Sequence, residues 1–79
     1  MELTIITPSG VLCNAQVEKA SFPGTKGAFT VLSNHAALVS TLGKGKIQYE
    51  VKGEAVEKEM DIERGMVEVK QNKIQVFIE

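Results

Sequence analysis

The chain has 79 residues, of which 43% are hydrophobic and 24% charged, and its 9 basic and 10 acidic side chains give a formal net charge of −1. A chain of this size is expected to form one small domain over residues 1–79, with room for a core and few interaction faces. The slight negative charge excludes a typical nucleic-acid binder, because contacts to phosphate need a surplus of Lys and Arg.

Cys13 is the sole cysteine, so an internal disulfide is excluded. The sequence does not open with a basic segment followed by an apolar stretch, and no apolar run is long enough for a membrane-spanning helix. These features predict a reducing, cytoplasmic setting. A domain this short draws only a few kcal/mol from one core, so we expect it to work docked to something larger.

Period-two alternation of apolar and polar residues is the dominant local pattern, and it places every second side chain on one face of a strand. In the first half of the chain it predicts strands over residues 3–7, 11–14, 15–22, 28–32 and 38–42. Pro8-Ser9-Gly10 supplies the first turn, and Pro23-Gly24 ends the third strand. We predict that 28–32 is a short buried strand and that Ser33-Asn34 starts a single helical turn at 35–37.

The second half of the chain is typical of two hairpins. Apolar residues alternate over 47–51 and again over 56–62, and Lys52-Gly53-Glu54 supplies the turn between them. The runs 66–69 and 74–78 flank a second turn, in which Asn72 tolerates positive φ.

No segment fits an amphipathic helix of three turns, so the fold is predicted to be all-β. Half-buried strands without a covering helix must pack their apolar faces against each other. We therefore expect a two-sheet sandwich, or flattened barrel, of about ten short and mostly antiparallel strands.

Cys13 and His35 are the side chains that suggest catalysis, because a thiolate beside a general base can attack a carbonyl. Cys13 follows Leu12 in a strand-like run, where a free cysteine usually packs as a small hydrophobe. His35 lies in a turn, where a lone histidine either packs and caps or contacts a partner, and the local sequence leaves both roles open. One cysteine and one histidine do not complete a structural zinc site. We predict no catalytic residue, metal or cofactor.

Two glycine-bracketed segments, Gly24-Thr25-Lys26-Gly27 and Gly43-Lys44-Gly45-Lys46, superficially suit phosphate, because glycine lets backbone N–H groups crowd an anion. Neither has the spacing of a phosphate-binding loop or a helix after it, so plain β-turns are predicted. Four acidic side chains spaced by two are predicted to line the solvent face of one strand with ordinary pKa values: Glu57, Glu59, Asp61 and Glu63.

Longer stretches of the sequence resemble the epsilon subunit family of the F-type ATP synthase. Residues 3–12 are similar to the first hairpin of that family. Residues 17–32, which read VEKASFPGTKGAFTVL, are similar to its central signature, in which a strand runs through Pro-Gly and a glycine-bracketed loop into the next strand. The family's His-Ala-Pro-Leu element appears as His35-Ala36-Ala37-Leu38, and its Gly-Gly before a late strand appears as Arg64-Gly65.

The resemblance implies a ten-stranded β-sandwich that serves as a non-catalytic rotor subunit in the central stalk, without a cofactor. Two sets of residues would then contact neighbouring subunits. The ring of c subunits would be contacted by Gly24, Thr25, Lys26, Gly27 and Ala28. The gamma subunit of the shaft would be contacted by His35, Ala36 and Leu38. Such a subunit helps couple proton flow to ATP synthesis. It lies peripherally on the cytoplasmic face of the bacterial inner membrane, among other ATP synthase subunits, and needs neither nucleic acid nor a homo-oligomer.

Three features depart from the family pattern. The loop carries Lys26 and Ala28 where relatives often place acidic side chains, which argues against a simple ion pair to a basic c-subunit loop. Ser33-Asn34 and Ala37 replace Pro-Gly and Pro, which predicts a less rigid turn before His35, because Pro restricts φ. The helical hairpin of longer relatives, associated with inhibiting ATP hydrolysis and in some members with binding ATP, is absent from this sequence.

Two other functions suit a small β-sandwich. A free-standing adaptor for a peptide or a sugar would need an apolar groove or exposed aromatic rings, yet the four aromatic side chains mostly keep strand phase with the core. A small hydrolase would use Cys13 and His35. Alkylation with iodoacetamide separates a nucleophilic thiol, which reacts quickly, from a packed thiol, which reacts slowly.

Overall fold

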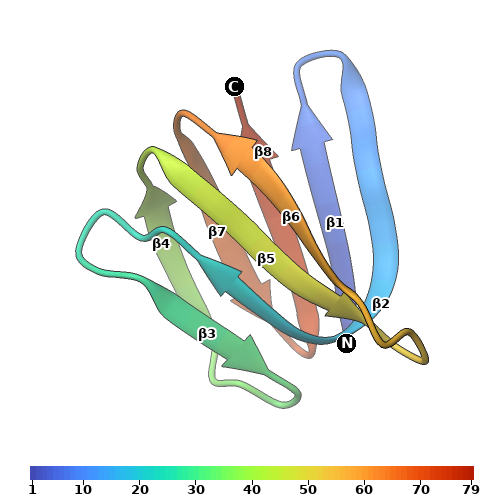
Figure 1. Cartoon of the computed structure of the whole chain (residues 1–79). Coiled ribbons are helices and arrows are strands. Elements are labelled where there is room, and N and C mark those ends of the chain that lie inside the picture. The colour runs from blue at the N-terminus through green and yellow to red at the C-terminus, as the bar shows by residue number, and fades with distance from the viewer.

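The computed structural model describes residues 1–79, and every regular element in it is a β-strand (Figure 1). In chain order the strands are β1 (Glu2–Thr7), β2 (Gly10–Phe22), β3 (Phe29–Leu32), β4 (Leu38–Leu42), β5 (Gly45–Val51), β6 (Glu57–Ile62), β7 (Gly65–Lys70) and β8 (Lys73–Ile78). Without helices, the chain has no helical segment that could cross a membrane.

Strand β2 takes part in both layers of the fold. Its first half pairs with β1, and its second half lies between β3 and β5. We call the layer with the strand order β4-β7-β8-β1-β2 sheet A, and the layer with the order β3-β2-β5-β6 sheet B. Sheet B lies in front of sheet A in Figure 1, and β2 bends from one layer into the other.

The two-layered all-β prediction is confirmed, but the chain forms eight strands rather than about ten. The expected break between 11–14 and 15–22 does not exist, because β2 runs through it. Its pairing shifts register opposite Ile5 and Ile6 of β1 and again between Val17 and Lys19. Such bulges bend a strand without ending it, which lets β2 change layers. Neighbouring strands are antiparallel except β1 and β8, which are parallel.

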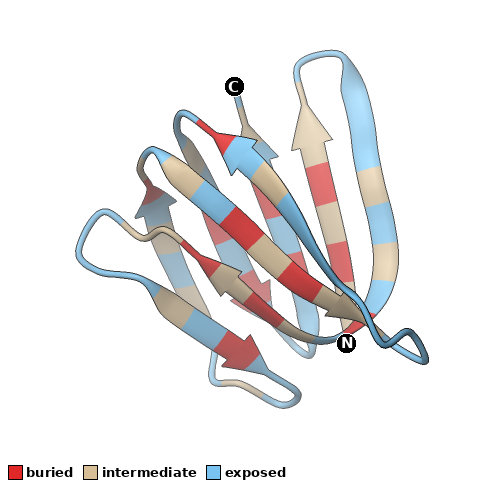
Figure 2. Cartoon of the chain, viewed as in Figure 1, coloured by how far each residue is buried: buried red, intermediate tan, exposed pale blue.

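The core lies between the two sheets and contains no buried polar or charged residue. Along β8, Ile74 and Val76 are buried while Gln75 and Phe77 are exposed, and Figure 2 shows alternating burial along the strands. Fourteen buried residues form one cluster: Leu3, Ile5, Val17, Ala20, Phe22, Val31, Leu42, Ile47, Tyr49, Ile62, Val67, Val69, Ile74 and Val76.

Both predicted hairpins are confirmed. Strands β5 and β6 pair from Gly45–Ile62 to Glu50–Glu57, and β7 and β8 pair from Gly65–Ile78 to Lys70–Lys73. Gln71 and Asn72 have φ values of 51° and 62°, so both central residues of the last turn are left-handed. This is the backbone form that two-residue hairpin loops favour.

Two predictions between residues 28 and 37 are wrong. Only Val31 is buried in β3, and Leu32 is 56% exposed, because β3 is an edge strand with a partner on one side. The helical turn at 35–37 does not form. Asn34 has a φ of 64°, a left-handed conformation that interrupts a right-handed helix, and the loop has to cross from sheet B to sheet A.

We expect truncation of the core to cost far more than truncation of the surface. Ile47 is fully buried, so Ile47→Ala should lower the free energy of unfolding by about 2–5 kcal/mol. Val56 is 67% exposed, and Val56→Ala should stay within about 0.5 kcal/mol of wild type. Urea unfolding followed by circular dichroism measures both, and equal losses for the two variants would refute this core assignment.

Candidate interaction surfaces

The loop 24–28 between β2 and β3 is a tight turn tied to the end of β4. The N–H of Gly27 donates to the carbonyl oxygen of Gly24 at 3.0 Å, and the N–H of Thr25 donates to that of Thr41 at 3.0 Å. The hydroxyl oxygens of Thr25 and Thr41 lie 2.6 Å apart. A Cβ on Gly24 would lie 2.6 Å from the Gly27 oxygen, so only glycine fits there without a backbone shift. Residues 25–28 remain exposed.

The β-turn predicted at this loop is confirmed, and the backbone amides of Gly24, Thr25 and Gly27 are already engaged. Besides the two bonds above, the N–H of Gly24 donates to Phe22 and the N–H of Gly43 donates to Pro23. These amides are therefore not free to bind a phosphate. Lys26 forms no ion pair, so its charge is the one that this loop offers to a neighbour.

The loop 33–37 carries His35 and lies at the opposite end of β3. The N–H of His35 donates to the carbonyl oxygen of Leu32 at 3.1 Å, and its Nδ1 lies 2.7 Å from the carbonyl oxygen of Ala36. The N–H of Asn34 donates at 2.9 Å to Oδ1 of Asn72 in the β7–β8 turn. Hydrogen bonds inside and outside the loop thus hold a turn that lacks the prolines of the resembled family.

Strand β4 connects the two predicted contact regions. It begins at Leu38, next to the His35 loop, and ends at Leu42, which forms a β-bridge with Gly24. The structure therefore keeps the two sets of predicted residues apart, at opposite ends of one strand. Leu38 is half-buried and packs against the core, whereas its neighbour Val39 points outward and is 64% exposed.

The outer face of sheet A carries a row of apolar side chains that the sequence analysis did not assign to a site. The pairing register places Met66 opposite Phe77, Phe77 opposite Ile6, and Ile6 opposite Val11. Residues directly opposite in neighbouring strands share a face of the sheet. We call these four residues of β7, β8, β1 and β2 the apolar stripe. Met66 and Phe77 are each 45% exposed, and Val11 is 66% exposed.

A groove of about 820 Å³ runs along this stripe at the end of the sheet. Its apolar wall is formed by Ile6, Met66 and Phe77 of the stripe, together with Leu42 at the end of β4 and Ile78 at the end of β8. Its rim carries an ion pair between Arg64 and Glu79. Apolar surface that stays exposed in this way makes this end of sheet A a candidate interaction surface.

The aromatic residues mostly follow core phase, as expected. Phe22 and Tyr49 are buried and Phe29 is half-buried, but Phe77 points away from the core into the groove wall. The signal was present in the sequence, since Val76, Phe77 and Ile78 are three consecutive apolar residues and adjacent strand residues point to opposite faces.

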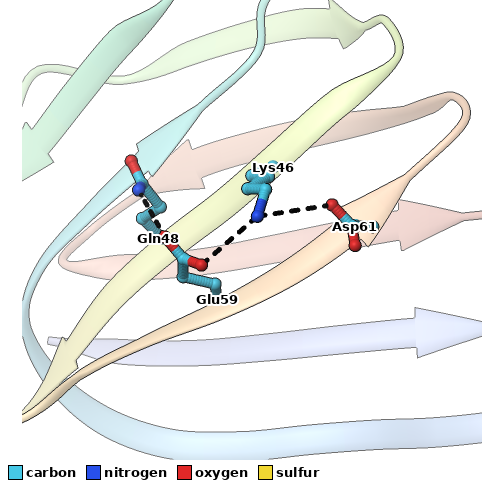
Figure 3. Close-up of polar contacts among 4 residues, drawn as sticks. All are labelled: Lys46, Gln48, Glu59 and Asp61. Atoms are coloured by element: carbon cyan, nitrogen blue, oxygen red, sulfur yellow. Dashed lines mark hydrogen bonds and ion pairs between the residues drawn. The ribbon is translucent and has the colours of Figure 1, made fainter.

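The outer face of sheet B is mostly polar and internally paired, with Leu32 of β3 as an exposed apolar exception. Gln48 Nε2 donates to Glu59 Oε2 at 2.9 Å, and Lys46 Nζ lies 3.4 Å from Glu59 and 4.0 Å from Asp61 (Figure 3). The acidic residues of β6 are exposed as predicted, but the ordinary pKa expected for Glu59 is wrong. The hydrogen bond from Gln48, aided by Lys46, lowers the pKa of Glu59.

Cys13 and His35 do not form a catalytic pair. Cys13 packs half-buried against the core, as predicted, and its Sγ lies 3.6 Å from the hydroxyl oxygen of Tyr49, while the polar contact of the His35 ring is with Ala36. No group of three or more His, Cys, Asp or Glu side chains gathers in the structure. Burial, with the Cys13 contact as a smaller cause, raises the pKa of Tyr49 to about 12.

Alkaline pH should therefore destabilise the fold through Tyr49. Its pKa rises from 10.0 to about 12 on folding, so the folded state keeps the phenolic proton longer than the unfolded state does. The resulting stability is complete below pH 10 and is lost as the pH rises through the folded pKa. Thermal unfolding of wild type and Tyr49→Phe between pH 9 and 12 should show the steeper decline in wild type. Parallel declines would contradict this role.

Comparison with known proteins shows extensive similarity. The model of the family described as "ATP synthase, Delta/Epsilon chain, beta-sandwich domain" matches residues 1–79. The chain is 38% identical over 77 residues to the ATP synthase epsilon chain of Leptospira interrogans, covering 98% of this chain and 59% of that protein. It is 37% identical over 79 residues to that of Sulfurimonas denitrificans, covering 100% and 60%. The chain thus spans about three-fifths of these curated relatives.

Solved structures share the fold at low sequence identity. A chain of the Tetrahymena thermophila mitochondrial ATP synthase central stalk and c-ring superposes with a TM-score of 0.84 at 18% identity, covering 99% of this chain and 62% of that one. A chain of the Euglena gracilis mitochondrial ATP synthase, in a structure of OSCP, F1 and c-ring, gives 0.88 at 19%, covering 96% and 48%. These likenesses show the two-layered β architecture.

Proposed function

Because the chain belongs to the family of ATP synthase delta/epsilon chain β-sandwich domains, we propose that it is a non-catalytic component of the central stalk in a proton-translocating F-type ATP synthase. In this role residues 1–79 act as one domain that links the gamma shaft to the c-subunit ring and helps couple proton flow to ATP synthesis. The observation that carries the proposal is the contrast between the apolar stripe at one end of the outer face of sheet A and the paired polar side chains on the outer face of sheet B.

A part that carries torque between a ring and a shaft must resist shear. Close-packed protein interiors have low compressibility and transmit strain. One apolar core joins both sheets here, and strand pairing runs without a gap from β4 through β2 to β6. In the proposed role this chain supplies mechanical stiffness and binding surfaces for its neighbours. The role requires no catalytic group or cofactor.

The gamma subunit is the proposed occupant of the outer face of sheet A. The contact begins at the end of β4 where His35, Ala36 and Leu38 lie. Val39 continues it on the outer face, where Met66 and Phe77 lie further along the sheet. Aromatic and methionine side chains in the centre of such a patch, with a charged rim, are the usual anatomy of a protein interface. The Arg64–Glu79 ion pair provides that rim.

The exposed loop at the other end of β4 is the proposed contact with the c ring: Gly24, Thr25, Lys26, Gly27 and Ala28. Its attachment to Thr41 and its glycine geometry present Lys26 on a fixed support. The charge of Lys26 suits an acidic or carbonyl-rich partner loop better than a basic one. In this proposal the chain lies peripherally at the membrane, on the cytoplasmic face in a bacterium, through the complex.

The groove also favours a second candidate, the free-standing adaptor that binds a peptide. A groove of about 820 Å³ with an exposed phenylalanine in its wall offers such a ligand an apolar seat. The two candidates differ in their partners, since only the first predicts recovery of gamma and c subunits.

Pull-down of a tagged chain from detergent extract tests the proposal. Wild type should recover gamma and c subunits, and Phe77→Glu should weaken gamma recovery about tenfold or more, because it places a charge in the centre of the apolar face. His35→Ala and Leu38→Ala should weaken it as well. Val56→Glu adds the same charge to another exposed apolar site, away from the stripe, and should recover gamma like wild type.

Two results would contradict the proposal. Failure of the folded wild-type chain to recover either subunit would remove the stalk function. Equal recovery by Phe77→Glu and Val56→Glu would remove the outer face of sheet A as the gamma contact.

A further inference from the structure

The loop 33–37 depends on few contacts for its shape. None of its residues belongs to a strand, so no ladder of hydrogen bonds holds it while it crosses from sheet B to sheet A. The bonds of His35 to Leu32 and Ala36 stay within the loop and its flank. The bond from the N–H of Asn34 to Oδ1 of Asn72 spans 38 positions and ties the loop to sheet A.

Asn72 is itself firmly placed. It occupies the turn between β7 and β8 with a φ of 62°, and its carbonyl oxygen accepts the N–H of Glu2 at 3.2 Å. The side chain therefore projects from a point where β1, β7 and β8 meet. Asn34 has a φ of 64°, so both partners are left-handed asparagines. Glycine would fit either backbone position, but at position 72 it has no side-chain oxygen to accept the bond.

We propose that Asn72 is a positioning residue that fixes the loop 33–37 for docking of the gamma subunit, through the hydrogen bond from the Asn34 amide to its side chain. The inference rests on the proposed function, because that function assigns His35 in this loop to the gamma contact. A loop held in its bound form loses less conformational freedom when the partner binds. The bond restricts the conformation of the loop before binding, as a proline in the loop would by fixing φ.

Three variants separate the side chain of Asn72 from the backbone of its turn. Asn72→Gly keeps a residue that accepts positive φ and removes the acceptor. Asn72→Asp keeps both the acceptor and a side chain that tolerates the left-handed region. Gln71→Gly is the matched control, since Gln71 is the adjacent left-handed residue with a φ of 51° and makes no side-chain hydrogen bond.

Amide hydrogen exchange of the 79-residue chain, resolved by NMR, measures the first half of the proposal. Asn72→Gly should speed exchange of the Asn34 amide about two- to tenfold, and the amides of β7 and β8 should stay protected. Gln71→Gly should leave the Asn34 amide as in wild type, and Asn72→Asp should restore protection. Unchanged exchange in Asn72→Gly, or no rescue by Asp, overturns the inference.

Recovery of the gamma subunit measures the second half. Asn72→Gly should weaken gamma recovery about two- to tenfold, with rescue by Asn72→Asp. If His35→Ala weakens recovery but Asn72→Gly does not, the positioning role is wrong and the proposed gamma contact stands. If neither His35→Ala nor Phe77→Glu alters recovery, the proposed contact is wrong, and the role of Asn72 in binding is refuted with it.

Discussion

The structure depends on one strand that belongs to two sheets. The first half of β2 is hydrogen-bonded to β1 in sheet A, and its second half is hydrogen-bonded to β3 and β5 in sheet B. Without this continuity, the two layers would be joined only by loops and by contact between their apolar faces. The bulges in β2 supply the bend, and the shared core between the layers supplies the stabilisation.

The outer faces of the two sheets differ in a way that follows from their residues. On sheet B, Lys19 pairs with Glu50, and Gln48 and Lys46 both reach Glu59, so the polar groups satisfy one another. On sheet A, the apolar stripe has no covering element in this chain. A stiff two-layered domain with paired polar groups on one outer face and an uncovered apolar stripe on the other is suited to lie between larger neighbours, as the proposed stalk function requires.

Local sequence pattern was enough to predict the all-β class, the two hairpins and the packing of Cys13. It predicted two strands where β2 is one, because the extra residue of a bulge shifts the apolar alternation by one position, and such a shift resembles a break between two strands. Burial in β3 was overestimated because being an edge strand is a property of the tertiary fold. The contact between Asn34 and Asn72 joins distant segments, so no local pattern contains it.

The candidate surfaces were predicted unequally. The loops at 24–28 and 33–37 came from the resemblance to the epsilon family, whereas the apolar stripe required the strand register that only the structure provides. Phe77 was the visible clue, as an apolar residue out of phase with the core side chains Val76 and Ile74. When an interaction surface is built from several strands, the strand register determines which exposed side chains become neighbours. The sequence of a single strand shows only the residues that this strand contributes.

Native-state hydrogen exchange along β2, at increasing sub-denaturing urea, tests most directly whether the two sheets are one cooperative body. Amides of β2 paired with β1 and amides paired with β5 should exchange with the same free energy of opening, equal to that of global unfolding. If the half of β2 in sheet B opened separately, at a clearly lower free energy than the half in sheet A, the layers would be independent. The claim that the two sheets form one stiff body between the neighbouring subunits would then be wrong.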